Sequence, residues 1–324
     1  MKLLEDGGLM ARFPYVLGVF AAVVALIASG CTSAAPGPSV SRPAPSSPNG
    51  AHGDFAGLVD IGGGHKLFLE CHGSGSPTVI LLSGYGNAGD IWNEADAHPP
   101  AVAPGVARFT RECAYDRPGS LRVVTDTGTP APSALPGRSD PAPMPRTAAD
   151  VTSELHTLLA TAGVPGPYVM VSHSFGGLFA LLYARTYPEQ VTGLVMIDTV
   201  TPQMRTALGS QHWQEYQQQA VQQPNEIPGY QSEQYDPDTS IKQIETAPPL
   251  RAMPVAVLIG DTLPTENKAD FQYAMFQALR EADHQFAASI PGATLTTVPN
   301  TTHYVQTLRP DIVIDAIRDV VERS

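Results

Sequence analysis

The most constraining feature of this chain is a short apolar run that passes directly into an apolar helical pattern. The residues Tyr168–Val171 are typical of a buried strand, and the sequence then reads Ser-His-Ser-Phe-Gly-Gly over 172–177. Only small side chains fit where strand and helix backbones nearly touch, and Ser172 and Gly176 stand two residues either side of Ser174. Such a turn lifts the Ser174 hydroxyl above the end of a sheet. Alternatively, Ser174 only caps the helix, a position where serine is favoured.

Around this turn, β-rich runs alternate with helical patterns. The predicted strands are Gly57–Ile61, Lys66–Cys71, Thr78–Leu82, Glu112–Tyr115, Tyr168–Val171, Gly193–Ile197, Val255–Ile259 and Thr294–Val298, and the predicted helices are Arg146–Ala162, Gly176–Tyr187, Glu266–Ala288 and Pro310–Glu322. This alternation predicts an α/β fold, in which helices cover the faces of a mostly parallel sheet. The stretches 118–145 and 201–250 are too long for plain connections, so each is expected to be a loop or cap over a site.

Composition excludes two classes of function. The chain has 19 Lys and Arg against 31 Asp and Glu, a formal net charge of -12. It therefore repels polyphosphate, and nucleic-acid binding is not expected. Its 3 cysteines include no C-x-x-C pair and no His/Cys cluster of zinc-binding spacing. No metal and no cofactor is expected.

The N-terminal segment is typical of an exported protein. An uncharged apolar run over 13–28 is shorter than the ~20 residues that a membrane-spanning helix needs, and it suits a signal peptide. Ala28-Ser29-Gly30-Cys31 follows and resembles a bacterial lipobox. We expect a lipoprotein signal peptide over 1–30, lipid on Cys31, a Pro/Ser/Ala-rich tether over 31–52 and a folded domain over 53–324. The alternatives are secretion with Cys31 incidental, or an uncleaved anchor.

The remaining cysteines, Cys71 and Cys113, would then form an even pair in an oxidising compartment. This makes them a candidate disulfide. Two buried thiols are the alternative.

The turn at Ser174 resembles the nucleophile elbow of the α/β-hydrolase family, whose pattern is Gly-x-Ser-x-Gly, with Ser172 in place of the first Gly. The resemblance extends from about Gly57 to the end of the chain. It implies the α/β-hydrolase fold: a mostly parallel eight-stranded sheet, helices on both faces, and a cap insertion at about 201–250. In the family's strand order the second strand, with Cys71, neighbours the fourth, with Cys113, which would allow a disulfide between them.

The family order of catalytic residues is nucleophile, acid, histidine. His303 follows the last predicted strand and is the expected base, whereas His173 and His284 are expected to be structural. Two aspartates end strands where the family places its acid. Asp198 closes the strand after the nucleophile helix, and Asp261 follows the penultimate strand. Both remain candidates.

The tetrahedral intermediate of acyl transfer needs two backbone donors. The resemblance implies the amides of Phe175 and of Tyr85, because the loop 83–87 resembles the family's oxyanion loop. The alternative is a plain glycine-rich turn. The residues 116–119, Asp-Arg-Pro-Gly, resemble a turn common in the family, where its role is structural, and we assign it no chemistry.

Together these features predict a serine hydrolase that cleaves carboxylic esters through an acyl-enzyme. The glutamines within 201–250 favour a hydrated entrance to the active site and short or medium esters as substrates. Amidase, peptidase or thioesterase activity on the same fold is an alternative, as is a non-catalytic cell-surface binding lipoprotein. The expected partners are a small ester substrate and, through the N-terminal lipid, the outer face of the cell membrane. The sequence carries no signal for oligomeric state.

Overall fold

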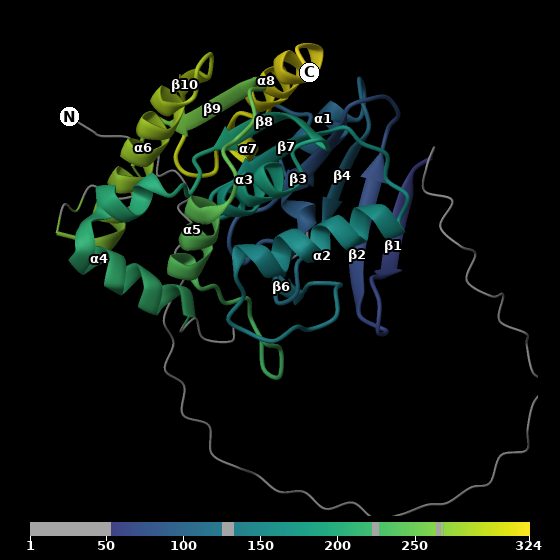
Figure 1. The fold of residues 1–324 in the computed structure, drawn as a ribbon, viewed down its shortest axis with the longest axis horizontal. Coiled ribbons are helices and arrows are strands. Elements are labelled where there is room, and N and C mark those ends of the chain that lie inside the picture. The colour runs from purple at the N-terminus through teal and green to yellow at the C-terminus, as the bar shows by residue number, and fades with distance from the viewer. Residues whose placement is uncertain (1–52, 125–132, 222–226, 264–266, 268) are drawn as a thin grey trace, which may run out of the picture. The chain divides into compact units, whose positions relative to one another are not determined.

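The computed structural model describes residues 53–324 except 125–132, 222–226, 264–266 and 268. The predicted signal peptide, Cys31 and the tether lie outside the described residues. At the centre is an 8-stranded sheet in the order β1-β2-β4-β3-β7-β8-β9-β10 (Figure 1). Its strands are β1 (Phe55–Asp60), β2 (Lys66–His72), β3 (Thr78–Leu82), β4 (Glu112–Tyr115), β7 (Tyr168–His173), β8 (Val191–Ile197), β9 (Val255–Gly260) and β10 (Thr294–Val298). Only β2 pairs antiparallel with its neighbours, so the predicted mostly parallel α/β sheet is confirmed.

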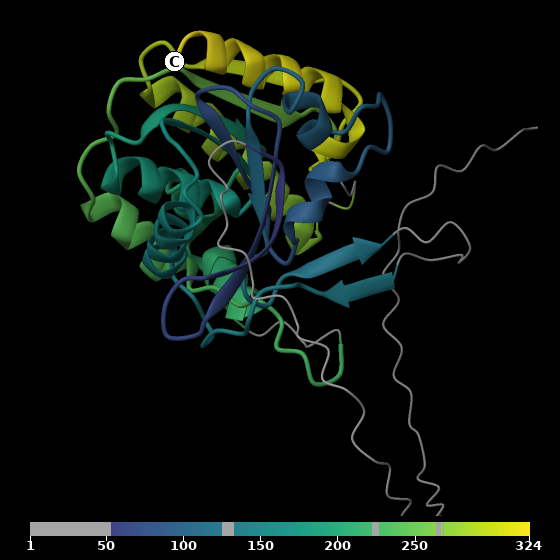
Figure 2. The ribbon, with the colours of Figure 1, turned by 90° about the vertical axis from the view of Figure 1, so that its right-hand side faces the viewer.

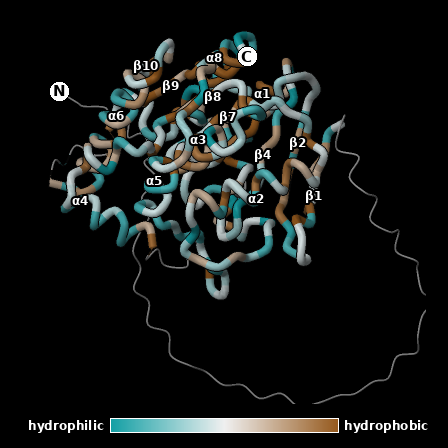
Figure 3. Tube along the Cα trace, viewed as in Figure 1, coloured by the Kyte–Doolittle hydropathy of each residue, from teal (hydrophilic) through white to brown (hydrophobic). Residues whose placement is uncertain are grey.

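Helices cover both faces of this sheet. They are α1 (Val102–Val106), α2 (Ala148–Thr161), α3 (Gly176–Thr186), α4 (Gln203–Val221), α5 (Pro237–Thr246), α6 (Phe271–Ser289), α7 (Val305–Leu308) and α8 (Pro310–Glu322), with a 3-10 turn at Gly89–Asn93. Successive residues of a strand point to opposite faces. Along β3, Ile80 belongs to the buried cluster that includes residues of α2, α3 and α6, and Leu81 belongs to the cluster that includes residues of α1 and α8. The central strands β3 and β7 are accordingly buried at every position, and hydrophobic residues, brown in Figure 3, run along the sheet. None of the helices within the described ranges is long and apolar enough to cross a bilayer.

The two long stretches contain secondary structure that the sequence pattern did not predict. Within 118–145, strands β5 (Leu121–Val124) and β6 (Ser133–Pro136) form a separate hairpin that points away from the main sheet (Figure 2). Within 201–250, α4 packs against α6, and α5 packs against α3. The helix α4 escaped prediction because it buries only three side chains, and because Gly209, at φ 76°, divides it into two helical segments.

The disulfide predicted between Cys71 and Cys113 is present. These residues are direct cross-strand partners in the antiparallel pair β2–β4, with Cα atoms 4.1 Å apart, and both are fully buried. The bond joins residues 42 positions apart. It therefore links β2, near the antiparallel edge of the sheet, to β4. Strand β4 lies beside β3, and the loop that follows β3 lies over the candidate active site.

Removing this disulfide is expected to lower stability by about 4 kcal/mol on the chain-entropy relation for a loop of this length. For a domain of this size that corresponds to a fall in Tm of about 10 °C. The measurement is thermal unfolding of the wild type with and without a reductant, beside a variant carrying Cys71→Ala and Cys113→Ala. The reductant should not change the Tm of the variant. An unchanged wild-type Tm after both thiols have been shown to be reduced would contradict the prediction.

Candidate active site

Ser174 lies on a sharp turn between β7 and α3. Its φ of 53° is in the left-handed region, which is strained for a residue other than glycine. The turn is held because the Ser174 carbonyl accepts hydrogen bonds from the amides of Gly177 (3.1 Å) and Val200 (2.8 Å). A Cβ atom at Gly176 would lie 2.7 Å from the carbonyl oxygen of Leu82, so no side chain fits there. The chain thus holds a serine in a strained backbone conformation at the carboxyl end of a buried strand.

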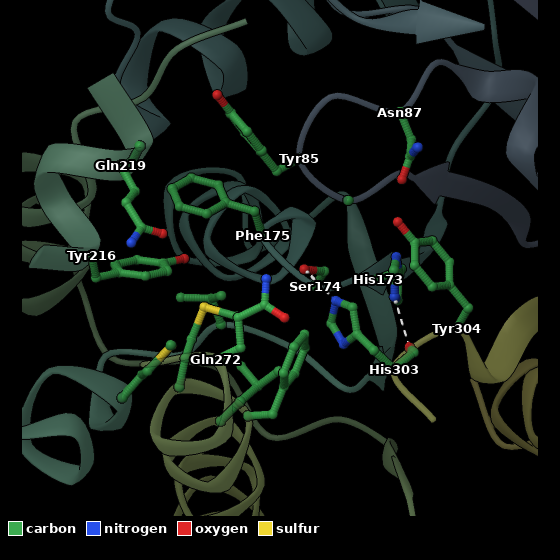
Figure 4. Close-up of a pocket in the computed structure, with 17 residues that line it drawn as sticks. Tyr85, Asn87, His173, Ser174, Phe175, Tyr216, Gln219, Gln272, His303 and Tyr304 are labelled. Atoms are coloured by element: carbon green, nitrogen blue, oxygen red, sulfur yellow. Dashed lines mark hydrogen bonds between the residues drawn. The ribbon is translucent and has the colours of Figure 1, made fainter. Parts of the chain in front are cut away.

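His303 connects this serine to a carboxylate. Its Nε2 lies 2.9 Å from Ser174 Oγ (Figure 4). Its Nδ1 lies 2.7 Å from Asp198 Oδ2. His303 comes from the loop after β10, and Asp198 directly follows β8, so parallel strands deliver all three residues to the same edge of the sheet. Both the imidazole and the carboxylate are largely buried, at 13% and 9% side-chain exposure. A shielded site of this kind strengthens the hydrogen bonds within it.

Asp261, the other acid candidate, has different partners. It is exposed, and its Oδ1 accepts hydrogen bonds from the Thr301 amide (3.1 Å) and the Thr262 hydroxyl (2.9 Å). Hydrogen bonds from the backbone at Asn300 and Thr301 lower the pKa of this carboxyl. Asp261 therefore binds the loop that leads to His303, whereas the imidazole itself binds Asp198.

A second buried carboxyl supports the turn that carries Asp198. Asp283 of α6 is fully buried and accepts hydrogen bonds from the Thr199 amide (2.9 Å) and the Thr199 hydroxyl (2.8 Å). Burial, and then the charge of Asp198, raise the pKa of Asp283 well above its usual range. Sequence reasoning missed this residue. Its signal was an acid on the apolar face of a helical pattern, four residues after Leu279 and three before Phe286.

The two other histidines considered from the sequence are not part of this hydrogen-bond chain. His173 Nε2 donates to the carbonyl oxygen of His303 (3.0 Å), and its ring lies 4.6 Å from the His303 ring. Burial, and then the proximity of His303, lower the pKa of His173 well below its usual range. It therefore stays neutral and holds the His303 backbone. His284 is exposed on α6.

The loop Ser83–Asn87 lies directly over Ser174. A Cβ atom at Gly84 would lie 2.8 Å from His173 Nδ1 and 3.0 Å from Ser174 Cβ, which shows how closely the loop backbone approaches the turn. Tyr85 and Phe175, the predicted sources of the oxyanion donors, both line the pocket at Ser174, and their rings are 6.4 Å apart.

Gly84→Ala is expected to lower kcat of the hydrolysis proposed below by about 10²-fold, the effect of losing one oxyanion donor. The added methyl group must push the loop away from Ser174, and the Tyr85 amide moves with it. Steady-state kinetics on p-nitrophenyl acetate measures the effect. Gly57→Ala is a suitable control, because Gly57 lies in β1 without a positive φ and a Cβ atom there would make only an ordinary contact, at 3.4 Å, with the Phe55 ring. Equal activity of the two variants would contradict this placement of the loop.

Arg117 lies in the turn 116–119, which was expected to be structural. Its side chain is only 1% exposed and donates to the carbonyl oxygens of Ser83 (2.9 Å) and Gly84 (2.7 Å). Its partner is Glu233, which lies between α4 and α5 and is also fully buried. The turn thus contacts the loop over Ser174 directly.

The pocket beside Ser174 has a volume of about 280 Å³ (Figure 4). Its polar lining includes Gln219 of α4, Gln272 of α6 and Asn87, and its apolar lining includes Val200, Met204, Met275, Phe276 and Leu279. Other cap glutamines, at 214, 217 and 218, line a separate surface groove. Of the cap residues that line the pocket at Ser174, Met204, Tyr216 and Ala220 are mainly apolar and Gln219 is polar, so the inner surface of the cap is more apolar than its glutamine content predicted. Among the described residues, no group of His, Cys, Asp and Glu side chains could hold a metal ion.

Comparison with solved structures shows the same fold. The chain resembles a thermophilic esterase from Thermogutta terrifontis, with a TM-score of 0.52 and 18% identity over 82% of this chain and 97% of that chain. It also resembles the carboxylesterase CesB from Bacillus subtilis, with a TM-score of 0.52 and 16% identity over 82% and 91% of the two chains.

Sequence comparison finds more limited matches. The chain is 31% identical over 124 residues to the putative carbamate hydrolase RutD of Cronobacter turicensis, which is 38% of each protein. It is 29% identical over 126 residues to the uncharacterized protein YqjL of Bacillus subtilis, 39% of this chain and 41% of that protein. The match spans less than half the length of each relative. A family model, however, matches residues 79–316, most of the folded part. The chain belongs to the alpha/beta hydrolase family.

Proposed function

We propose that this protein is a serine hydrolase that cleaves carboxylic esters through an acyl-enzyme at Ser174. The observation that carries the proposal is the hydrogen-bond chain from Ser174 Oγ through His303 to Asp198, beside a pocket of ligand size. A nucleophile, a base within hydrogen-bond reach and a group that orients the base are the parts that covalent acyl transfer requires.

The geometry suits each step of the reaction. With its Nδ1 hydrogen donated to Asp198, His303 has a lone pair on Nε2 that takes the Ser174 proton as Oγ attacks the ester carbonyl carbon. The amides of Tyr85 and Phe175 donate to the resulting oxyanion. Collapse of the intermediate breaks the ester C–O bond, and His303 gives its proton to the departing alcohol. Water then attacks the acyl-enzyme with His303 as base, and the carboxylic acid leaves Ser174.

The pocket and the relatives support an ester as substrate. Apolar side chains from α4 and α6 line the pocket and suit an acyl group, and Asn87 and Tyr304 lie on the other side of Ser174 (Figure 4). Two of the structural neighbours are esterases by name. Amides, thioesters and carbamates could react with the same groups, so the choice of acyl compound needs a direct test.

The test is covalent labelling with a fluorophosphonate, read by intact mass, followed by a panel of substrates. The wild type should gain one adduct, Ser174→Ala should gain none, and p-nitrophenyl esters should be cleaved faster than the matching thioester, anilide and carbamate. Faster cleavage of the carbamate or anilide would replace the ester in this proposal. Absence of an adduct on folded protein would overturn it in favour of a binding protein.

We further propose that the chain is exported and anchored by lipid on Cys31, as the lipobox-like residues before it suggest. Cys31→Ser should then release the protein from the membrane fraction of expressing cells, and mass spectrometry of the wild type should show a diacylated N-terminal peptide. Membrane association that survives the substitution would contradict the lipid anchor.

A further inference from the structure

A buried ion pair joins the cap region to the loop over Ser174. Arg117 Nε donates to Glu233 Oε1 at 2.7 Å, and the two side chains are 1% and 0% exposed. They are separated by 116 positions in the sequence. Buried charges are costly unless they are fully paired, so this arrangement requires a compensating set of contacts. Those contacts are with the Tyr235 hydroxyl, 2.8 Å from Arg117 Nε, and with the loop Ser83–Asn87.

Both members of the pair bind the backbone of that loop. Arg117 donates from Nη1 to the Ser83 carbonyl and from Nη2 to the Gly84 carbonyl, at 2.9 and 2.7 Å. Glu233 Oε2 accepts a hydrogen bond from the Gly86 amide at 2.9 Å. The Tyr85 hydroxyl donates to the Glu233 carbonyl at 2.7 Å, and the Glu233 amide donates to the Gly119 carbonyl at 2.9 Å. The loop, the turn after β4 and the cap region are thus joined at one point.

These contacts determine the orientation of both peptide groups that flank Tyr85. The cis peptides in the described chain all precede proline, so the bond between Gly84 and Tyr85 is trans. In a trans peptide the carbonyl oxygen and the amide hydrogen point in opposite directions. Because Arg117 holds the Gly84 carbonyl, the Tyr85 amide hydrogen must point away from Arg117. On the other side of Tyr85, Glu233 holds the Gly86 amide in the same way.

We propose that Glu233 is a positioning residue for the oxyanion donor: with Arg117 it clamps the peptides around Tyr85 so that the Tyr85 amide faces the substrate oxygen. This inference rests on the proposed acyl transfer at Ser174. Preorganised donors accelerate acyl transfer because they need no reorientation as charge develops on the oxygen. It also gives the cap region a role in the chemical step, in addition to its role in lining the pocket.

The test compares Glu233→Gln and Glu233→Asp with the wild type on p-nitrophenyl acetate. Glutamine removes the charge, and aspartate is too short to reach Arg117 and the Gly86 amide together. We expect kcat to fall by about 10²-fold in the first variant and by about 10-fold in the second, with KM changed by less than about threefold. The inhibition constant of a trifluoromethyl ketone, whose adduct carries an oxyanion, should rise in parallel with the loss of kcat.

Glu154→Gln is the matched control. Glu154, whose side chain is 24% exposed, pairs at 2.6 Å with the buried Arg146. No hydrogen bond or ion pair among the described residues joins either side chain to the loop Ser83–Asn87. This control should lose stability without losing kcat. If the Glu233 variants keep wild-type kcat and ketone affinity, or lose them only as much as Glu154→Gln, the inference is wrong. A wild type that cleaves no ester and gains no fluorophosphonate adduct would instead overturn the proposed function.

A measurement on the wild type covers the case in which the Glu233 variants do not fold. Binding of the trifluoromethyl ketone should slow amide hydrogen exchange in the loop 83–87 and in 229–235 together, because the clamp links the two segments. Slower exchange confined to 83–87 would contradict the clamp.

Discussion

Ser174→Ala is expected to lower kcat for ester hydrolysis by roughly 10⁵- to 10⁶-fold, the range found when the nucleophile of a serine hydrolase is removed. The Ser174 hydroxyl lies 2.9 Å from Nε2 of His303, the proposed base, and its removal leaves only substrate binding and the proposed oxyanion donors. Steady-state kinetics on p-nitrophenyl acetate, with extensive purification to exclude contaminating esterase, measures the loss.

His303→Ala should lower kcat nearly as much. The kcat of the double variant should be little lower than that of either single variant, because nucleophile and base act as a unit. Ser172→Ala is the matched control. Ser172 is a buried serine two residues away whose hydroxyl contacts the Met196 sulfur at 3.3 Å, so its loss should change kcat only a few-fold. Losses that add fully in the Ser174 and His303 double variant would show that the two residues do not act in one step.

The sheet could be predicted from the sequence because its signals are local. Thr78–Leu82 is an apolar run bounded by proline and by a glycine-containing loop, and its observed bounds are those predicted. The turn at Ser174 was recognisable for the same reason, since the small residues it needs are adjacent in the sequence. By contrast, α4 is a polar segment that is helical because Met204, Leu208 and Trp213 pack into the core.

The supporting contacts of the candidate site could not be predicted, because they join residues far apart in the chain. Glu233 meets Arg117 over 116 positions, and Asp283 meets Thr199 over 84. Glu233, Arg117 and Thr199 look like ordinary polar residues in their local sequence, and Asp283 stands out only as an acid on the apolar face of a helical pattern. Their role depends on burial, which only the packed structure provides, and a buried carboxyl in a folded protein requires a partner.

The choice between Asp198 and Asp261 also depends on contacts between residues far apart in the chain. Both follow a strand of the parallel sheet, so local pattern gives each a similar claim to the role of acid. In the structure the two carboxylates have different partners: His303 Nδ1 lies at Asp198, and the Thr301 amide lies at Asp261. An acid that holds the imidazole in one tautomer and stabilises its protonated form must bind Nδ1 directly.

Asp198→Asn should therefore lower kcat by about 10⁴-fold, because the amide favours the wrong imidazole tautomer while the shape of the site is kept. Asp261→Asn, the matched control, should lower kcat only a few-fold through the loop that precedes His303. The two variants are compared on p-nitrophenyl acetate at neutral pH, with fluorophosphonate labelling rates as a second readout. A large loss in Asp261→Asn with near-normal activity in Asp198→Asn would reverse the assignment, and it would mean that the His303 loop adopts another arrangement during catalysis.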